Sequence, residues 1–319
     1  MVEPLPALLA DIGGTPTRFA LSGAGGVVPA GEIVHTADFD SVEQAIADYL
    51  ATNAGTTRPD RAILAVAGPV TGNRVQLTNA DWDIEGAAVA HRFGLDTVRL
   101  VNDFAAVARA LPLLGPEDRD VIGDWQPEPR GPMVAIGPGT GLGVAGLVPV
   151  GPRGWLTVPG EGGHVTLPAM TDAEAAVLAV LRRRVDHVSA ERVLSGIGLP
   201  ALDAAIAVLE GAPPRPDRDP EAVLAAARTG EAAALRAVGM FVDLLATVAG
   251  DLALTFGASG GVYLAGGMPH YLGDLFDPAR FRARFEAKGR SSSYLRRIPT
   301  AVVNHAQPGL LGLSAIAAE

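Results

Sequence analysis

The chain has 319 residues, of which 48% are hydrophobic and 19% charged, a length that allows about two domains. Its 39 glycines and 25 prolines exceed the usual share, but the apolar content suffices for a packed core, so we expect them in turns rather than in disordered segments. The absence of cysteine excludes disulfides, thiolate metal sites and cysteine nucleophiles, and a net charge of −10 disfavours nucleic acid and anionic membranes as partners.

The first half of the chain alternates short apolar runs with amphipathic segments, which is typical of an α/β layer. Residues 7–10 and 19–21 are expected to pair as a hairpin across the Gly-rich turn that follows Asp11. The other expected elements are strands over residues 62–67, 75–78 and 98–101 and helices over residues 41–51, 85–93 and 104–111.

The segment 111–132 is polar and rich in proline, and we expect a domain junction there. Beyond it the pattern of strand, Gly-rich turn and strand found near residue 13 recurs near residue 139. Thr171 and Glu174 form a capping box that starts a helix. The expected strands cover residues 133–136, 144–148, 261–267 and 301–303, and the expected helices 171–185, 219 onward, 231–256 with interruptions at Gly239 and Gly250, 278–287 and 308–318.

Two features exclude particular classes of site. The single lysine, Lys288, lies in the segment EAKGR, so the chain has no P-loop, and any phosphate must be bound by backbone amides, arginine or a metal ion. The N-terminal segment has no basic region of the kind found in secretory signals. The longest charge-free stretch, 252–273, contains six glycines and a proline and does not resemble a membrane span, so we expect a cytoplasmic α/β protein.

The first candidate site is Asp11 with Gly13, Gly14 and Thr15. Glycines let backbone amides approach an anion closely because no Cβ intervenes, and a neighbouring carboxylate can hold Mg²⁺ through water. The alternative is an ordinary β-turn in which the aspartate bonds its own backbone.

A second Gly-rich turn spans Gly137 to Gly143 and has two interpretations. Gly141, Gly143 and Gly146 match a dinucleotide-binding pattern with Glu161 downstream, but that site needs a helix to begin at the turn. The following segment VAGLVPVGPRGWLTV carries glycine and proline at intervals that no helix tolerates. We therefore favour a phosphate-binding turn between two strands.

Several polar residues could bind a substrate. Asn102 and Asp103 follow a strand and begin a helix, where they could cap the helix or place a carboxylate to take a proton from a hydroxyl. Glu161, His164 and Glu191 are good acceptors for sugar hydroxyls, although a lone histidine in a turn more often has a structural role.

Taken in order, these segments resemble the bacterial ATP-dependent glucokinase family, in the superfamily of hexokinase, actin and heat-shock ATPases. The matching segments span nearly the whole chain and are LLADIGGTPTRFAL, AVAGPV, LTNADWDI, LVNDFAAVARALP, GPGTGLGVAGL, VPGEGGHVTL, HVSAERVLSGIGL, GVYLAGGM, RFEAKGRSSSYLRRIP and QPGLLG.

The resemblance implies a two-domain actin-like ATPase fold, ribonuclease H-like, with an active-site cleft between a small α/β domain (1–111 plus 300–319) and a large one (112–299). It also implies a cytoplasmic, glycolytic homodimer that uses ATP and Mg²⁺ to phosphorylate glucose at the 6-hydroxyl. The implied site residues are Asp103 as general base, Asn102, Asp103, Glu161, His164 and Glu191 for glucose, Asp11, Gly13, Gly14, Thr15, Gly139, Thr140, Gly141, Gly266 and Gly267 for ATP, and Asp11 for Mg²⁺ through water.

Three positions depart from the family pattern. Pro16 stands where asparagine is common, Ile197 replaces proline in SGPGL, and His270 lies where relatives often have a longer segment with arginine. These changes leave open two alternatives: a catalytically silent sugar- and nucleotide-binding regulator, and a kinase for a related hexose or with another phosphoryl donor.

Overall fold

The computed structural model describes residues 6–23, 31–53, 55, 58–77, 82–212 and 218–319. The chain divides into two compact units, Met1–Gly115 with His305–Glu319 and Pro116–Asn304. From the sequence we expected the chain to re-enter the first domain at residue 300. In the structure residues 300–304 belong to the second unit, where strand β13 (Thr300–Val303) pairs with β12 (Gly261–Leu264).

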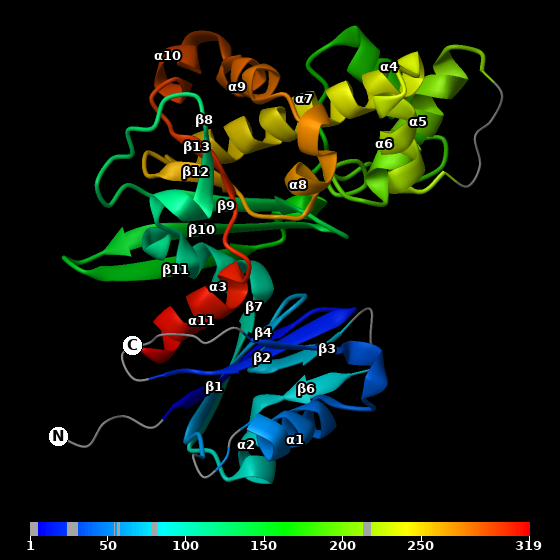
Figure 1. Cartoon of the computed structure of the whole chain (residues 1–319). Coiled ribbons are helices and arrows are strands. Elements are labelled where there is room, and N and C mark those ends of the chain that lie inside the picture. Colours follow the sequence, from blue (N-terminus) through cyan, green and yellow to red (C-terminus); the bar gives the residue numbers. More distant parts are fainter. Residues whose placement is uncertain (1–5, 24–30, 54, 56–57, 78–81, 213–217) are drawn as a thin grey trace. The chain divides into compact units, whose positions relative to one another are not determined.

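The first unit is built on a mixed five-stranded sheet with the order β3-β2-β1-β4-β7 (Figure 1). The expected hairpin is confirmed, since β1 and β2 pair antiparallel, whereas β1, β4 and β7 run parallel. Its strands are β1 (Ala7–Ile12), β2 (Pro16–Leu21), β3 (Glu32–His35), β4 (Arg61–Val66) and β7 (Thr97–Asn102), with a separate ribbon of β5 (Arg74–Gln76) and β6 (Asp83–Glu85).

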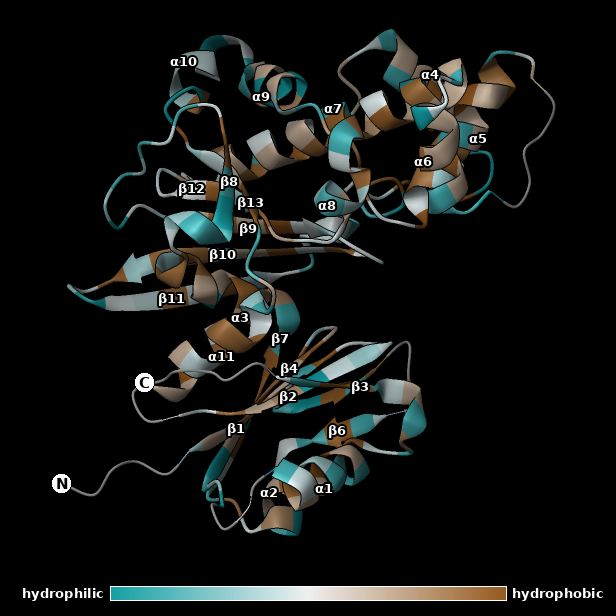
Figure 2. Cartoon of the chain, viewed as in Figure 1, coloured by the Kyte–Doolittle hydropathy of each residue, from teal (hydrophilic) through white to brown (hydrophobic). Residues whose placement is uncertain are grey.

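Helices cover both faces of this sheet, which is why β1 is apolar without alternation. Leu8 and Ile12 pack in one core with helices α1 (Val42–Asn53) and α2 (Gly86–Phe93). Leu9, on the opposite face, packs in a second core with α3 (Asp103–Ala110) and α11 (Pro308–Ala317). The last helix is strongly apolar and is mostly brown in Figure 2. The segment Val75 to Thr78 was expected as one strand; β5 ends at Gln76, and Thr78 lies outside the described residues.

The second unit is built on a six-stranded sheet with the order β11-β10-β9-β12-β13-β8, in which β9, β12 and β13 run parallel. Its remaining strands are β8 (Arg119–Ile122), β9 (Met133–Pro138), β10 (Leu142–Val150) and β11 (Gly154–Gly160). The helices are α4 (Asp172–Leu181), α5 (Gly198–Leu209), α6 (Pro220–Arg228), α7 (Ala232–Phe256), α8 (Met268–Leu272), α9 (Pro278–Glu286) and α10 (Ser292–Leu295). Short 3-10 turns are η2 (Thr36–Asp38) and η3 (Leu111–Leu113) in the first unit, and η4 (Pro116–Asp118), η5 (Gly162–His164), η6 (Gly273–Leu275) and η7 (Gly289–Ser291) in the second.

Helix α7 of the second unit has 25 residues and runs without a break through Gly239 and Gly250, contrary to the expected interruptions. By length and composition α7 could cross a membrane, but 72% of its apolar window is buried within the protein, as in the core helix of a globular domain. Because glycine has no side chain, a cationic side chain from elsewhere packs against the helix at each of these positions: Arg280 at Gly239 and Lys288 at Gly250.

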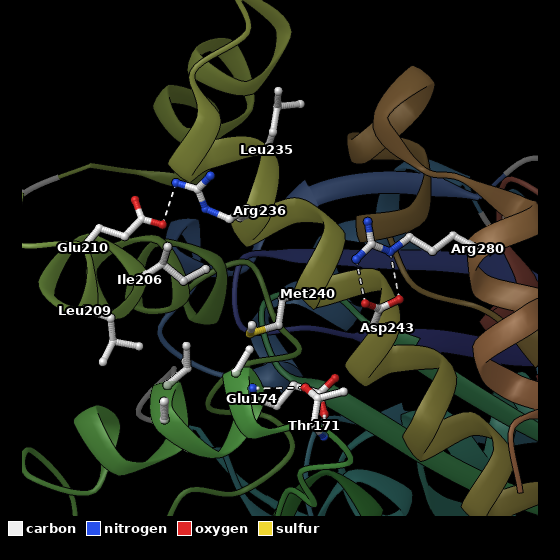
Figure 3. Close-up of a pocket in the computed structure, with 13 residues that line it drawn as sticks. Thr171, Glu174, Ile206, Leu209, Glu210, Leu235, Arg236, Met240, Asp243 and Arg280 are labelled. Carbon is white, nitrogen blue, oxygen red and sulfur yellow. Dashed lines mark hydrogen bonds and ion pairs between the residues drawn. The ribbon is translucent and has the colours of Figure 1, made fainter.

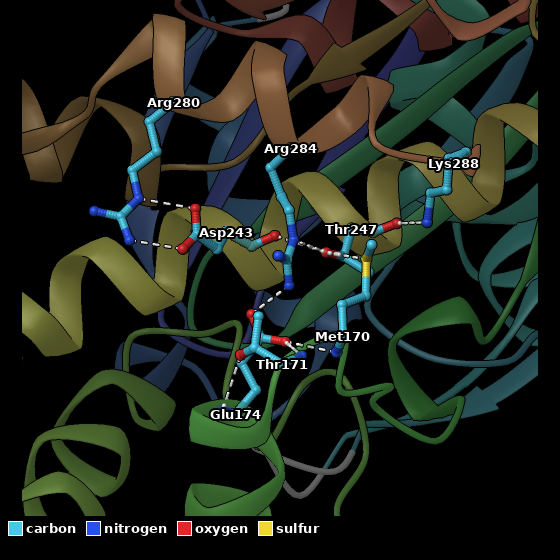
Figure 4. Close-up of polar contacts among 8 residues, drawn as sticks. All are labelled: Met170, Thr171, Glu174, Asp243, Thr247, Arg280, Arg284 and Lys288. Carbon is cyan, nitrogen blue, oxygen red and sulfur yellow. Dashed lines mark hydrogen bonds and ion pairs between the residues drawn. The ribbon is translucent and has the colours of Figure 1, made fainter. Parts of the chain in front are cut away.

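A buried polar cluster joins three helices of this unit (Figure 4). The expected capping box is confirmed, because the Thr171 hydroxyl accepts from the Glu174 amide and the Glu174 carboxylate accepts from the Thr171 amide. Glu174 also pairs with Arg284 of α9, whose Nε donates to the Thr247 hydroxyl on α7 at 2.9 Å. The only lysine is held beside this cluster, since Lys288 Nζ donates to the Thr247 carbonyl and to Asp251.

Candidate active site

The first Gly-rich turn joins β1 to β2, and a buried threonine holds its carbonyls. The Thr36 hydroxyl donates to the Gly13 carbonyl at 2.9 Å, and the Thr36 amide donates to the Thr15 carbonyl at 2.8 Å. The Gly13 amide is bound to the Pro16 carbonyl at 3.0 Å. The next two amides, those of Gly14 and Thr15, have no hydrogen-bond partner among the described residues, so two adjacent donors can receive an anion.

Asp11 lies near the end of β1, close to this turn. Its carboxylate is 24% exposed and receives no hydrogen bond within the described part of the chain. Burial raises the pKa of Asp11, and the nearby Arg18 guanidinium, with Nη1 3.9 Å from Oδ2, partly offsets this effect. Both oxygens of the carboxylate can therefore accept a hydrogen bond from water or a ligand.

Asn102 and Asp103 lie at the same edge of the sheet. Ile12, Val66 and Asn102 are aligned in register across the parallel strands β1, β4 and β7, so both segments leave the sheet at its carboxyl edge. The capping interpretation is confirmed for Asn102, whose Oδ1 accepts from the Ala105 amide at 3.1 Å. Asp103 is the first residue of α3; its Oδ1 accepts from the Phe104 amide at 2.8 Å, and its side chain is partly exposed.

The second Gly-rich turn joins β9 to β10 in the second unit. The Gly139 amide donates to the Gly141 carbonyl at 2.8 Å, and the Gly139 carbonyl accepts from the Gly196 amide at 2.7 Å. The amides of Thr140 and Gly141 are unpaired within the described ranges, as in the first turn. A strand follows the turn, so the dinucleotide interpretation, which needs a helix, is wrong.

The three candidate sugar-binding residues of this unit lie around that second turn. Glu191 Oε2 accepts from the Leu142 amide at 2.8 Å, and the Glu191 amide donates to the Gly163 carbonyl at 2.8 Å. Turn η5, which contains Gly163, ends at His164, whose Nε2 lies 3.9 Å from Glu161 Oε2. A Cβ on Gly163 would lie 2.1 Å from the Leu142 carbonyl oxygen, so this close approach requires glycine.

Gly266 and Gly267 follow strand β12, which runs parallel to β9. A Cβ on Gly266 would lie 2.2 Å from the Pro138 carbonyl oxygen, so Gly266 packs directly against the start of the second turn. Gly267 caps the short helix α8. The structure thus forms one group of candidate residues in each unit. The first unit holds Asp11, Gly13, Gly14, Thr15, Asn102 and Asp103, and the second holds Gly139, Thr140, Gly141, Glu161, His164, Glu191, Gly266 and Gly267.

Two residues that support the turns were not identified from the sequence. Thr36 is fully buried and Gly196 is half-buried, and each reaches its turn from a distant segment. Neither has a local signature, since a lone threonine before a short turn and a glycine in SGIGL are common in loops. Among the described residues no three histidine, cysteine, aspartate or glutamate side chains come together as a metal site.

The structure shows the surroundings of the three residues that depart from the family pattern. Pro16 removes one amide from the first turn, but its carbonyl accepts from Gly13, so the turn closes normally. The His270 ring nitrogen Nε2 lies 2.9 Å from the Val303 carbonyl and therefore contacts the end of β13. Ile197 is 70% exposed directly after Gly196, beside the second turn.

A separate pocket of about 520 Å³ lies among α4, α5, α7 and α9 (Figure 3). Its apolar side chains include Ile206, Leu235 and Met240, and ion pairs join Glu210 to Arg236 and Asp243 to Arg280 along its walls. None of the candidate site residues lines this pocket. It is therefore distinct from the group of residues around the second turn.

The family model for glucokinase matches residues 8–319, nearly the whole chain. The chain belongs to the glucokinase family. It is 44% identical to a glucokinase of Nitrobacter hamburgensis over 309 residues, which cover 96% of this chain and 95% of that protein. It is 45% identical to a glucokinase of Aromatoleum aromaticum over 311 residues, covering 97% and 94%.

Among solved structures, the glucokinase of an Antarctic psychrotroph superposes with a TM-score of 0.88 at 36% identity, over 98% of both chains. This protein therefore has the fold of that glucokinase over nearly its whole length, including the mixed α/β sheets. The resemblance inferred from the sequence motifs is confirmed at the level of the family.

Proposed function

We propose that this glucokinase-family protein transfers the terminal phosphoryl group of ATP to the 6-hydroxyl of glucose. Relatives at 44% and 45% identity over nearly the whole chain carry the name glucokinase. The observation that carries the proposal is the pair of Gly-rich turns, each with bound carbonyls and two consecutive unpaired amides within the described residues. Such turns supply what a P-loop supplies elsewhere, namely backbone donors for phosphate oxygens.

Asp103 is the proposed general base. Its carboxylate stands at the end of a strand and the start of a helix, where a hydrogen bond from the Phe104 amide limits its rotation. A carboxylate suffices for this task, because phosphoryl transfer depends on positioning and charge neutralisation and the hydroxyl loses its proton late.

The residues of the two turns are proposed to bind a magnesium–nucleotide complex. Gly13, Gly14, Thr15, Gly139, Thr140 and Gly141 would bind the phosphates, Gly266 and Gly267 would lie against the adenosine, and Asp11 would hold Mg²⁺ through water. The Asp11 carboxylate fits that last role, because it accepts no hydrogen bond from the described residues and water-bridged Mg²⁺ needs an available oxygen acceptor. When bound, the metal neutralises charge on the transferring phosphate.

Asn102, Asp103, Glu161, His164 and Glu191 are proposed to bind glucose. The strongest support is at Glu191, where the Leu142 amide binds only Oε2. Oε1 accepts no hydrogen bond from the described residues and is available to a sugar hydroxyl. Asn102 already uses its amide group to cap α3 and to contact the Gly68 carbonyl at 3.3 Å. The bond to helix α3 therefore fixes the position of the side chain with which Asn102 would bind the sugar.

We also propose the finer properties that the resemblance implies. These are an actin-like ATPase fold with two α/β domains around an active-site cleft, a cytoplasmic location and a homodimer. Sedimentation equilibrium tests the oligomeric state directly. A monomer at micromolar concentration would contradict that part of the proposal.

A panel of sugars and phosphoryl donors tests the activity. Purified protein is assayed with glucose, mannose, fructose and glucosamine, each with ATP, ADP or polyphosphate, and product formation is followed by mass spectrometry. Glucose 6-phosphate formed from glucose and ATP at the highest kcat/KM is expected. A folded protein that is stabilised by glucose but forms no product would instead be a regulator, and a preference for another sugar or donor would replace glucose or ATP in the assignment.

A further inference from the structure

One neighbour of the Asp11 carboxylate lies at the far end of the chain. On its own sheet, the Arg18 guanidinium is 3.9 Å away, and no described residue donates a hydrogen bond to the carboxylate. The distant neighbour is Gly309, in the first turn of α11. A Cβ on Gly309 would lie 2.7 Å from Asp11 Oδ2 and 3.0 Å from its Cγ. The backbone of α11 therefore rests directly against this carboxylate.

The backbone conformation of Gly309 does not require glycine. The residue lies inside a helix, and it is not among the glycines with positive φ. Alanine at such a position is normally favoured over glycine by about 0.5–1 kcal/mol. The contact with Asp11 is the reason that a side chain does not fit here, since the three atoms nearest to the position of an added methyl group all belong to that carboxylate.

Three sets of contacts hold helix α11 in place. Leu310 and Leu313 are fully buried in the core beneath the sheet. A Cβ on Gly312 would lie 1.7 Å from the Ala106 carbonyl oxygen, so α11 and α3 are already in the closest contact that their backbones allow. The Gln307 side chain binds both main-chain groups of Gly31, at 3.0 and 3.4 Å. A methyl group added at residue 309 would consequently displace the Asp11 side chain and leave the helix in place.

We propose that Gly309 is a positioning residue that sets the direction of the Asp11 carboxylate. This inference rests on the proposed function, in which Asp11 holds Mg²⁺ through water. The C-terminal helix then contributes to nucleotide binding without touching the nucleotide. A displaced carboxylate would bind the magnesium–nucleotide complex less tightly, while the Gly-rich turns and the sugar residues would be unchanged.

The substitution Gly309→Ala tests the proposal. The Mg²⁺ concentration that gives half the maximal rate should rise by about tenfold, in the range found when a group that orients a metal ligand is lost. Calorimetric titration gives a readout independent of turnover: the affinity for ADP with Mg²⁺ should fall by a similar factor, whereas the affinities for Mg²⁺-free ADP and for glucose should not change. The urea midpoint of unfolding should stay the same or rise, because alanine favours the helix.

Two further variants identify the route of the effect. Gly312→Ala adds the same methyl group to the same helix, but against the backbone of α3; it should lower the unfolding midpoint and leave the Mg²⁺ dependence of the folded protein unchanged. In an Asp11→Ala background, Gly309→Ala should cause no additional loss of Mg²⁺-dependent binding, because a residue that acts only through Asp11 has nothing left to position.

Two results would overturn the inference: a wild-type Mg²⁺ dependence in Gly309→Ala, or the same loss of affinity on adding Gly309→Ala whether or not Asp11 is present. The proposed function fails separately. If the wild-type protein phosphorylated no sugar, the assignment as a kinase would be wrong, and the calorimetric comparison with Mg²⁺ and ADP would still decide the role of Gly309.

Discussion

At the scale of single residues, the candidate site combines ordinary side chains with unusually close backbone contacts. Gly163 and Gly266 each lie where a Cβ would overlap a carbonyl oxygen, and Thr36 binds two carbonyls of the first turn. These contacts place other parts of the chain against carbonyl groups of the turns and of their flanking strands. The amides that remain unpaired are then the chemically available groups.

Replacing the proposed base gives the most direct residue-level prediction. Asp103→Ala should lower kcat by about 10²–10⁴-fold, the usual contribution of a general base, while glucose still binds. Asp103→Asn should lower kcat to a similar extent, because the amide cannot take the proton. Stopped-time assays of glucose 6-phosphate together with glucose titration measure the two effects. Near-normal turnover in either variant would show that another group accepts the proton.

Removing the support of the first turn should affect both nucleotide binding and stability. Thr36→Val keeps the volume of a fully buried side chain and removes the hydroxyl that binds Gly13. The free energy of unfolding should fall by about 1–3 kcal/mol because the half-buried Gly13 carbonyl and the buried Thr17 hydroxyl each lose a hydrogen-bond partner, and the KM for ATP should rise.

Thr300→Val is a matched control, since Thr300 is also fully buried and donates to a backbone carbonyl, that of Ile122. It should lower stability without changing the KM for ATP. Equal changes of KM in both variants would mean that the effect of Thr36 comes from general destabilisation.

At the scale of elements, α7 shows how tertiary contacts determine the meaning of helix glycines. Glycine normally weakens a helix, yet both glycines of α7 are accommodated because cationic side chains from the α9 region occupy the space above them. The two sites are not equivalent. At Gly239 the three atoms nearest to a Cβ all belong to the Arg280 guanidinium, whereas at Gly250 the Cβ would meet the Phe285 carbonyl oxygen at 2.9 Å as well as Lys288.

Gly250→Ala should therefore destabilise the protein, by about 1–3 kcal/mol as expected for overpacking. Gly239→Ala should be nearly neutral, since the Arg280 side chain can move aside and alanine favours the helix. Urea unfolding of both variants measures the difference in free energy. A larger loss at residue 239 than at residue 250 would contradict this interpretation of the contacts.

At the scale of the whole molecule, the candidate residues are divided between two compact units, each with its own hydrophobic core. The proposed nucleotide contacts come from both units: Gly14 and Thr15 from the first, Thr140 and Gly141 from the second. One nucleotide should consequently affect both units at once, although each unit folds around its own sheet.

Hydrogen–deuterium exchange tests this expectation. The amides of Gly14 and Thr15 in the first turn, and of Thr140 and Gly141 in the second, are unpaired among the described residues and should exchange rapidly in the free protein. Adding ADP with Mg²⁺ should slow exchange in peptides that contain residues 13–15 and in those that contain residues 139–141. Glucose alone should not slow exchange at residues 13–15. Protection of only one turn by the nucleotide would contradict the proposal that both turns bind its phosphates.

The sequence by itself determined the α/β class, most element positions, the two Gly-rich turns and the family, because each depends on residue types and spacing within one segment. It missed α5, and it missed β11, whose two glycines and one proline are typical of loops. Only the tertiary structure showed that Thr36 and Gly196 support the turns and that Gly309 rests against Asp11. These contacts join segments far apart in the chain, and local periodicity does not indicate which distant backbone will lie opposite a given residue.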